Sequence, residues 1–270
     1  HGKGGRRIYK ALLTRLAASP FSFFSDIRSL RDCHKKRISV EDWQLYRLYE
    51  NEGLADNLIT ASALIPVLSH CYRNSKTLRN IFDDKALFHQ YCRESGIETA
   101  PIFALVKNDD FSLCDIESID ELLDADDLFI KPVDGVCGKG AFKLTKTATG
   151  FQDHETRNSI KRRNLKDYLL NMARKFPAGL IVQPCIANHS DLKKLTGTNA
   201  LATLRVVTCR IGKTPRLVAA TLRCPQGIES CTDNYAQGGI CINMDLNKNV
   251  LGSHGYQKGN AGPKLHSCHP

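Results

Sequence analysis

The chain has 270 residues, of which 42% are hydrophobic, so it is long enough to bury a core in one large domain or two smaller ones. Its mean hydropathy is -0.30 and no apolar run approaches the roughly 20 residues of a membrane helix, so no membrane span is expected. The net charge of +10 favours an anionic partner such as a nucleotide. No RNA-binding aromatic motif or helix-turn-helix pattern supports a nucleic acid as that partner.

The cysteine pattern bears on location and on metals. Eleven cysteines without a C-x-x-C pair argue against a disulfide framework and predict a cytoplasmic location. A cluster of His266, Cys268 and His269 has no second ligand pair at zinc spacing. The sequence therefore nominates no metal ligand.

Residues 1–80 are predicted to be helical. Ser39 has the pattern of a helix start. A second helical stretch covers residues 55–72 and contains Pro66, which would kink it.

A third helix is predicted over residues 85–95. Asp84 is expected to cap it, because its carboxylate can accept hydrogen bonds from the first turn, and Gly96 suits a left-handed C-terminal cap. Residues 101–106 then indicate a short strand, and residues 116–123 an acidic helix.

A β-hairpin is predicted next. Strands at residues 127–133 and 141–145 flank a glycine-rich turn at residues 134–140. A helix over residues 165–176 and a strand over residues 179–186 follow.

Longer strands are predicted from residue 202 onward. Residues 202–211 and 215–224 flank a Gly-Lys-Thr turn at residues 212–214, which indicates an antiparallel hairpin. Residues 239–246 and 250–255 indicate a second strand pair.

Lys131 and the turn GVCGKG at residues 135–140 form the first candidate site. The turn is not a Walker A loop, because Gly140 stands where Ser or Thr is needed, and it is not a dinucleotide fingerprint, because a strand follows it. An ordinary hairpin turn would explain the glycines alone. However, a lysine in a strand is costly to bury unless it meets an anion, and a glycine turn can present backbone N–H groups to phosphates. A phosphate site is therefore predicted.

Several motifs in chain order resemble one known family. They are Asp84-Lys85, FIKP followed by GxxGKG, IVQP, TLRVVT at residues 203–208, Arg223, and DNxAxGGI at residues 233–240. The first motifs are similar to an ATP-grasp domain, and the last three resemble the sugar-transfer-associated ATP-grasp family. The resemblance covers about residues 80–270.

The resemblance implies an ATP site with several parts. The flap over the triphosphate would consist of Gly135, Gly138, Lys139 and Gly140. The α and β phosphates would be contacted by Lys85 and Lys131. The adenine hinge would be Gln183 and Ile186, the latter donating its N–H because Pro184 has none. Asp191 is the candidate for the ribose hydroxyls.

The resemblance also implies a transfer site on the later strands. Arg205 and Arg223 would act on the γ-phosphate or the acyl-phosphate, because guanidinium groups bind such anions well. Both lie at odd offsets from the turn at residues 212–214, so alternation can place them on one face. Asp233 and Asn234 would order the acceptor substrate.

Two departures from the family pattern bear on activity. The family usually has Asn before TLR, whereas this chain has Ala202, which puts one polar contact near Arg205 in doubt. The acidic residues that hold Mg2+ in the family follow a His-Pro pair, here His269-Pro270, where this sequence stops. Mg2+ is therefore an expected cofactor without nominated ligands. The chain is expected to be a fragment or an impaired enzyme that turns over ATP poorly.

The predicted fold is α+β, an ATP-grasp fold with a helical N-terminal region. The expected divisions are the helical region at residues 1–80, a small lobe with the flap at residues 81–182, and the first part of a large lobe at residues 183–270. The implied function is an ATP-dependent carboxylate-amine ligase that forms an amide through an acyl-phosphate, in cell-surface polysaccharide or glycan tailoring.

The expected partners are ATP and a small carboxylate or amine, which family context would make sugar-linked. No nucleic acid is expected as a partner. The sequence leaves the oligomeric state open. Two alternatives remain beside the ligase: a phosphotransferase on the same fold, and a nucleotide-binding module impaired in catalysis. An amide product or a phosphorylated product would separate the first two.

Overall fold

A computed structural model describes most of the chain from residue 61 onward: residues 61–72, 76–135, 138–226, 233–257 and 264–267. It also describes residues 31, 35, 36, 38, 43, 48, 53, 56 and 58. The described residues fall into two compact units, one up to residue 72 and one from residue 76 onward. Among them, no helix has the length and apolar character needed to cross a membrane.

In the first unit, Ile38, Trp43 and Leu48 form a small buried cluster. Helix α5 (Ala61–Tyr72) contains Pro66, as predicted, although it begins six residues later than expected. The helix start predicted at Ser39 lies outside the described residues.

The second unit begins with α6 (Lys76–Asp83) and α7 (Lys85–Glu94). The caps predicted for α7 are confirmed: the Asp84 carboxylate accepts hydrogen bonds from the N–H groups of Ala86 and Leu87, and Gly96 has a φ of 68°. Ala86 packs against a small cluster of Ile102, Val133 and Ile181, which attaches α7 to the first sheet.

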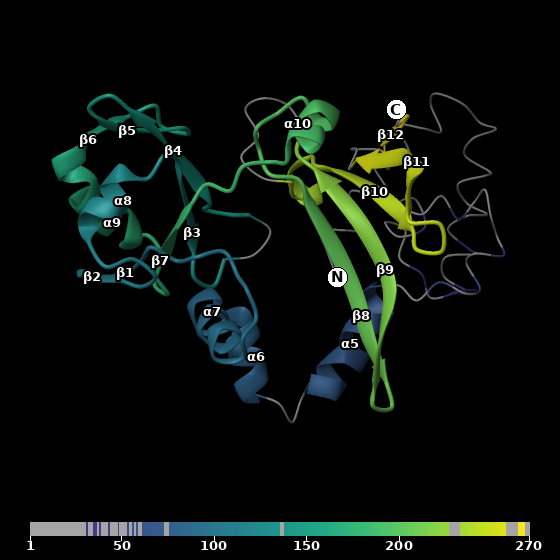
Figure 1. Cartoon of the computed structure of the whole chain (residues 1–270). Coiled ribbons are helices and arrows are strands. Elements are labelled where there is room, and N and C mark those ends of the chain that lie inside the picture. The colour runs from purple at the N-terminus through teal and green to yellow at the C-terminus, as the bar shows by residue number, and fades with distance from the viewer. Residues whose placement is uncertain are drawn as a thin grey trace. The chain divides into compact units, whose positions relative to one another are not determined.

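The first sheet has seven strands in the order β2-β1-β7-β3-β4-β5-β6, and every neighbouring pair is antiparallel (Figure 1). The strands are β1 (Ala104–Lys107), β2 (Asp110–Leu113), β3 (Leu128–Pro132), β4 (Phe142–Thr147), β5 (Gly150–Asp153), β6 (Ser159–Lys161) and β7 (Leu180–Pro184). The predicted hairpin of β3 and β4 is confirmed.

The main core lies between this sheet and two helices, α8 (Ile119–Asp124) and α9 (Leu165–Ala173). Leu128 and Ile130 of β3 are fully buried in it, together with Leu122 of α8 and Leu169 of α9. Each such side chain contributes about 1.5–3 kcal/mol of hydrophobic stabilisation. Because side chains alternate along a strand, Phe129 and Lys131 of β3 lie on the opposite face.

Helix α8 begins three residues later than predicted, because Ser118 caps it. The Ser118 hydroxyl accepts a hydrogen bond from the Glu121 N–H, and the Glu121 carboxylate accepts one from the Ser118 N–H. This reciprocal capping box fixes where the helix starts.

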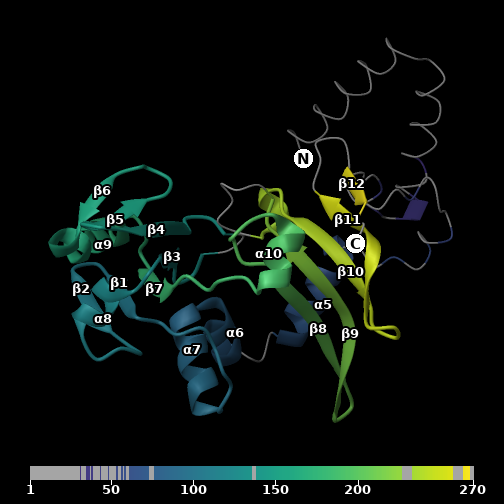
Figure 2. The same ribbon diagram turned by 45° about the horizontal axis from the view of Figure 1, so that its top comes forward.

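The second sheet has five antiparallel strands in the order β12-β11-β10-β9-β8 (Figure 2). They are β8 (Thr203–Ile211), β9 (Thr214–Cys224), β10 (Ile240–Asp245), β11 (Val250–Gln257) and β12 (Lys264–Ser267). Both predicted pairs, β8 with β9 and β10 with β11, are confirmed. Leu192 of α10 (Ser190–Thr196) packs on a cluster of Ala202, Leu222 and Ile242.

The β8–β9 hairpin differs from its prediction in one detail that matters for the site. Ile211 pairs with Thr214, so the turn has two residues, Gly212 and Lys213, rather than three. The register then shifts between Val207 and Thr208, because β9 carries an extra residue there. This β-bulge restores the pairing that a three-residue turn would have given.

Candidate functional site

A pocket of about 480 Å³ opens on the face of the first sheet that carries Phe129 and Lys131. Lys143 of β4 and Gln183 of β7 also line it, and each is paired with Phe129 across the ladder. Directly opposed residues on antiparallel strands point to the same face, so these side chains form one floor. Residues 198–201, Thr203 and Asp233 also line the pocket. A volume of this size is typical of small-molecule sites.

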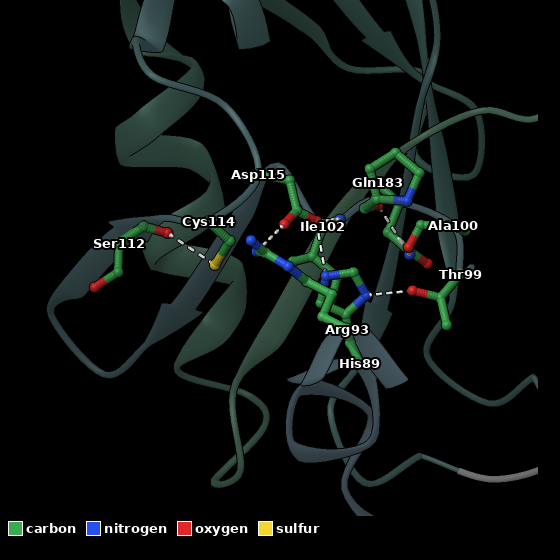
Figure 3. Close-up of polar contacts among 10 residues, drawn as sticks. His89, Arg93, Thr99, Ala100, Ile102, Ser112, Cys114, Asp115 and Gln183 are labelled. Atoms are coloured by element: carbon green, nitrogen blue, oxygen red, sulfur yellow. Dashed lines mark hydrogen bonds and ion pairs between the residues drawn. The ribbon is translucent and has the colours of Figure 1, made fainter. Parts of the chain in front are cut away.

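Gln183 is buried, with only 6% of its surface exposed, and it fixes a wall of the pocket. Its side-chain amide donates hydrogen bonds to the carbonyls of Ala100 and Pro101, at 3.2 and 3.0 Å. Ala100 lines the pocket, so this contact positions the segment before β1 against the site (Figure 3).

A polar cluster orders the same segment from the other side, as Figure 3 shows. Asp115 accepts hydrogen bonds from the Ile102 N–H and from the Arg93 guanidinium, both at 2.6 Å. His89 Nε2 lies 2.8 Å from Asp115 Oδ2, and His89 Nδ1 lies 2.6 Å from Thr99 Oγ1. These contacts join α7 to residues 99–102, and we infer that they maintain the shape of the pocket wall.

The end of β7 brings backbone groups of residues 184–186 to the pocket. Pro184 has no N–H, and the Cys185 N–H donates to the Asp127 carbonyl at 2.8 Å. Ile186 lines the pocket, and its N–H has no hydrogen bond within the part of the chain that the structure describes. The structure therefore brings Gln183 and Ile186 together at the pocket.

Asp191, the candidate for the ribose, lies elsewhere. Its side chain is 75% exposed at the start of α10, close to His189 and Lys194, and it is not part of the pocket lining. Asn199, from the same connection between β7 and β8, does line the pocket.

Lys131 is a cation facing the pocket from a partly buried position. Burial lowers its pKa, and the positive charge of Lys85 lowers it further. Its ammonium lies 5.9 Å from the centre of the Phe129 ring. No carboxylate forms an ion pair with it among the residues that the structure describes. The positive charge of Lys131 is therefore available to attract an anion bound in the pocket.

Lys85 sits behind this site rather than in it. Its ammonium donates to the carbonyls of Pro132, Val133 and Gly135, at 3.0, 3.0 and 2.6 Å. Burial lowers its pKa, and the charges of Asp134 and Asp84 oppose that change. The predicted direct contact of Lys85 with a phosphate remains a prediction.

The glycine turn needs its glycines. Gly138 and Gly140 have φ angles of 70° and 72°, which residues with a Cβ rarely adopt. A Cβ at Gly140 would also lie 2.6 Å from the Phe176 ring. Lys139 between them is exposed, and none of the described turn residues, Gly135 included, lines the pocket.

Arg205 and Arg223 lie on one face of the second sheet, as predicted. Arg223 is opposite Thr203, and Arg205 is two residues further along β8. Cys241 lies opposite Arg223 on β10. Burial raises the pKa of its thiol, the charges of Arg223 and Arg205 oppose that rise, and the charge of Asp233 adds to it. The two arginines thus share one electrostatic environment.

Asp233 connects this face to the pocket. It forms an ion pair with Arg223 at 2.5 Å. The Arg223 side chain is 18% exposed and the Asp233 side chain 12%. Asp233 also accepts a hydrogen bond from the Thr203 hydroxyl. Thr203 and Asp233 also line the pocket. Arg223 Nε is buried and has no hydrogen-bond partner among the described residues. Asn234 instead caps a short 3-10 turn, η2 (Tyr235–Gln237), by accepting from the Ala236 N–H.

Sequence reasoning missed Phe129, Lys143 and Asn199 as pocket residues. Phe129 could have been found, because it alternates with buried Leu128 and Ile130 and so shares a face with Lys131. Lys143 follows from the hairpin register. No local signal identifies Asn199, which reaches the pocket through the path of a connecting segment.

The sequence profile of the family described as sugar-transfer associated ATP-grasp matches residues 70–270. The chain belongs to this family. No protein in a search of curated proteins matches the chain. Family membership agrees with the α+β fold and implies an ATP-dependent ligase or transferase.

Magnesium, which usually accompanies ATP, has no evident site among the described residues of this ATP-grasp protein. Within the described residues, no group of three or more His, Cys, Asp or Glu side chains could hold a metal ion. Of the terminal Cys/His cluster, Cys268 and His269 lie outside those residues. The metal-ligating side chains among the described residues therefore do not form a magnesium site, and no catalytic step is assigned to a magnesium ion. The requirement for Mg2+ remains a prediction.

Proposed function

We propose that this protein binds ATP in the pocket and uses it to activate a carboxylate for ligation to an amine. The observation that carries the proposal is Lys131, a cation without a carboxylate partner in the described chain, facing a pocket that also offers the free Ile186 N–H. Adenine would lie against the Phe129 ring and would accept a hydrogen bond from the Ile186 N–H. The triphosphate would then pass Lys131 toward the glycine turn.

The transfer chemistry would occur at the Asp233 end of the pocket. A carboxylate oxygen would attack the γ-phosphorus, and ADP would leave, which gives an acyl-phosphate. An amine nitrogen would then attack the acyl carbon and lose a proton as inorganic phosphate leaves. The protein would contribute position and charge: Lys131 on the phosphate chain, and Arg205 and Arg223 where negative charge moves during transfer.

Trapping with hydroxylamine tests this reaction class. ATP, hydroxylamine and a panel of simple and sugar-linked carboxylates should yield a hydroxamate, ADP and phosphate in equal amounts, because hydroxylamine captures an acyl-phosphate. A phosphorylated alcohol would instead favour the phosphotransferase alternative. ATP binding without any product would favour a nucleotide-binding module, and an absence of ATP binding by calorimetry would reject the proposal altogether.

We expect Arg205 and Arg223 to act on one anion. Replacing either with lysine should lower ATP turnover by about 10²–10³-fold but weaken ATP binding much less, because a contact made mainly as charge moves affects kcat more than affinity. Turnover and affinity of both single variants and the double variant would be measured. The double variant should lose less than the sum of the single free-energy losses. Simply additive losses, or wild-type turnover in both single variants, would contradict a shared anion.

A further inference from the structure

The side-chain amide of Gln183 has a fixed orientation in the pocket (Figure 3). Its NH2 group donates to the carbonyls of Ala100 and Pro101, and these two hydrogen bonds use both of its protons. Turning the amide around would bring its oxygen against two carbonyl oxygens and would lose both hydrogen bonds. The two carbonyls therefore determine which way the amide points.

The other polar atom of this amide, Oε1, is left as an acceptor. It makes no hydrogen bond within the described part of the chain, and it is not fully enclosed there. Because Gln183 lines the pocket, a polar ligand group that meets Oε1 has to be a donor. The 6-amino group of adenine is a donor, whereas the 6-oxo group of guanine or hypoxanthine is an acceptor. Selection at this point depends on the amide keeping its orientation.

The segment that carries the two carbonyls is itself held by buried polar contacts. Asp115 Oδ2 accepts a hydrogen bond from the Ile102 N–H, and His89 Nδ1 is hydrogen-bonded to the Thr99 hydroxyl. His89 Nε2 lies 2.8 Å from Asp115 Oδ2, which connects the two contacts. The His89 and Asp115 side chains are only 12% and 15% exposed, so water competes weakly for these contacts. Residues 99–102 are therefore fixed at both ends.

We propose that Asp115 and His89 are positioning residues for base selection. By fixing residues 99–102, they keep the Gln183 amide oxygen directed at the pocket, so that the site prefers a purine with a 6-amino group. This inference rests on the proposed nucleotide site and deepens it.

A ratio of two nucleotide affinities tests the proposal. Purine riboside triphosphate is ATP without the 6-amino group, so it loses only the contact with Oε1. Calorimetric titration of the wild-type protein should show ATP binding about five- to tenfold more tightly. In Asp115→Ala, this ratio should fall to about twofold or less, because the carbonyls that orient the amide are released. Gln183→Leu should also bring it close to one, and adding Asp115→Ala to that variant should change it no further.

Two control variants separate this role from a general effect on the fold. Arg93 donates to Asp115 Oδ1 but makes no hydrogen bond to residues 99–102 in the described chain, so Arg93→Gln should keep the wild-type ratio. Asp115→Asn should also keep it, because the amide oxygen can still accept from the Ile102 N–H. His89→Phe preserves the ring volume and should lower the ratio at least about twofold, which provides the same test if Asp115→Ala does not fold.

The possible results have distinct consequences. Equal affinities of the wild-type protein for the two nucleotides would overturn the proposal. So would a wild-type ratio in Asp115→Ala, or in His89→Phe if Asp115→Ala does not fold, even if all affinities fell together. Either result would leave the proposed ATP site in place. A wild-type protein that binds no nucleotide would instead reject the proposed function, and this inference with it.

Discussion

Replacing Asp233 with alanine is expected to lower the free energy of unfolding by about 3–5 kcal/mol. The change leaves the Arg223 guanidinium, whose side chain is 18% exposed, without its carboxylate partner, and a charge in such a place is costly when unpaired. It also removes the acceptor of the Thr203 hydroxyl. Urea unfolding followed by circular dichroism would measure the loss. Asp233→Asn should lose less, because its amide oxygen can still accept one of the two hydrogen bonds.

Asp109→Ala is the matched control for this prediction. Asp109 also pairs with an arginine, Arg174 at 2.9 Å, but both side chains are largely exposed. Exposed ion pairs contribute little to stability, so no measurable change is expected. An Asp233→Ala protein as stable as the Asp109→Ala protein would show that the Arg223 pair is not a stabilising feature of the second sheet.

Replacing Lys131 with methionine is expected to weaken ATP binding by about 10–150-fold, which corresponds to the roughly 1.5–3 kcal/mol of a hydrogen bond to a charged group. Stability should stay the same or rise, because the change removes a cation from a partly desolvated position. Calorimetric titration with ATP and thermal unfolding of the same samples would measure both quantities. Weaker ATP binding without a loss of stability distinguishes a binding residue from a residue needed for folding.

The pH dependence of binding provides a further check on Lys131. Its pKa lies below the usual lysine value of about 10.4, so raising the pH removes its proton earlier than from an exposed lysine. ATP affinity of the wild-type protein should therefore begin to fall below that pH. The Lys131→Met protein should lack this part of the fall, and Lys161→Met, an exposed control, should retain it. Equal affinities in the wild-type and Lys131→Met proteins would remove Lys131 from the site.

Several expectations from the sequence remain predictions. They include the cytoplasmic location, the domain boundaries, the magnesium requirement, the amide product and the link to glycan tailoring. The family establishes an ATP-dependent ligase or transferase, and the hydroxylamine experiment is the most direct way to narrow it.

Local sequence patterns determined most of the secondary structure and part of the site. The cap at Asp84, the alternation of Leu128 and Ile130 with Phe129 and Lys131, and both strand pairs of the second sheet were predictable, because each depends on residues close in the chain. The short strands β2, β5 and β6 were not predicted. Each has only three or four residues, so its formation depends on the neighbouring strand rather than on its own pattern.

Tertiary structure decided how the predicted residues combine. The one-face position of Arg205 and Arg223 was predicted for a three-residue turn, but the real turn has two residues, and only the bulge in β9 brings the arginines back to one face. The Asp233–Arg223 pair joins residues ten positions apart across a loop, and the three carbonyls around Lys85 lie 47 to 50 positions from it. A sequence specifies which groups carry charge, but desolvation and hydrogen-bond geometry, which exist only after folding, determine which partner each charge takes.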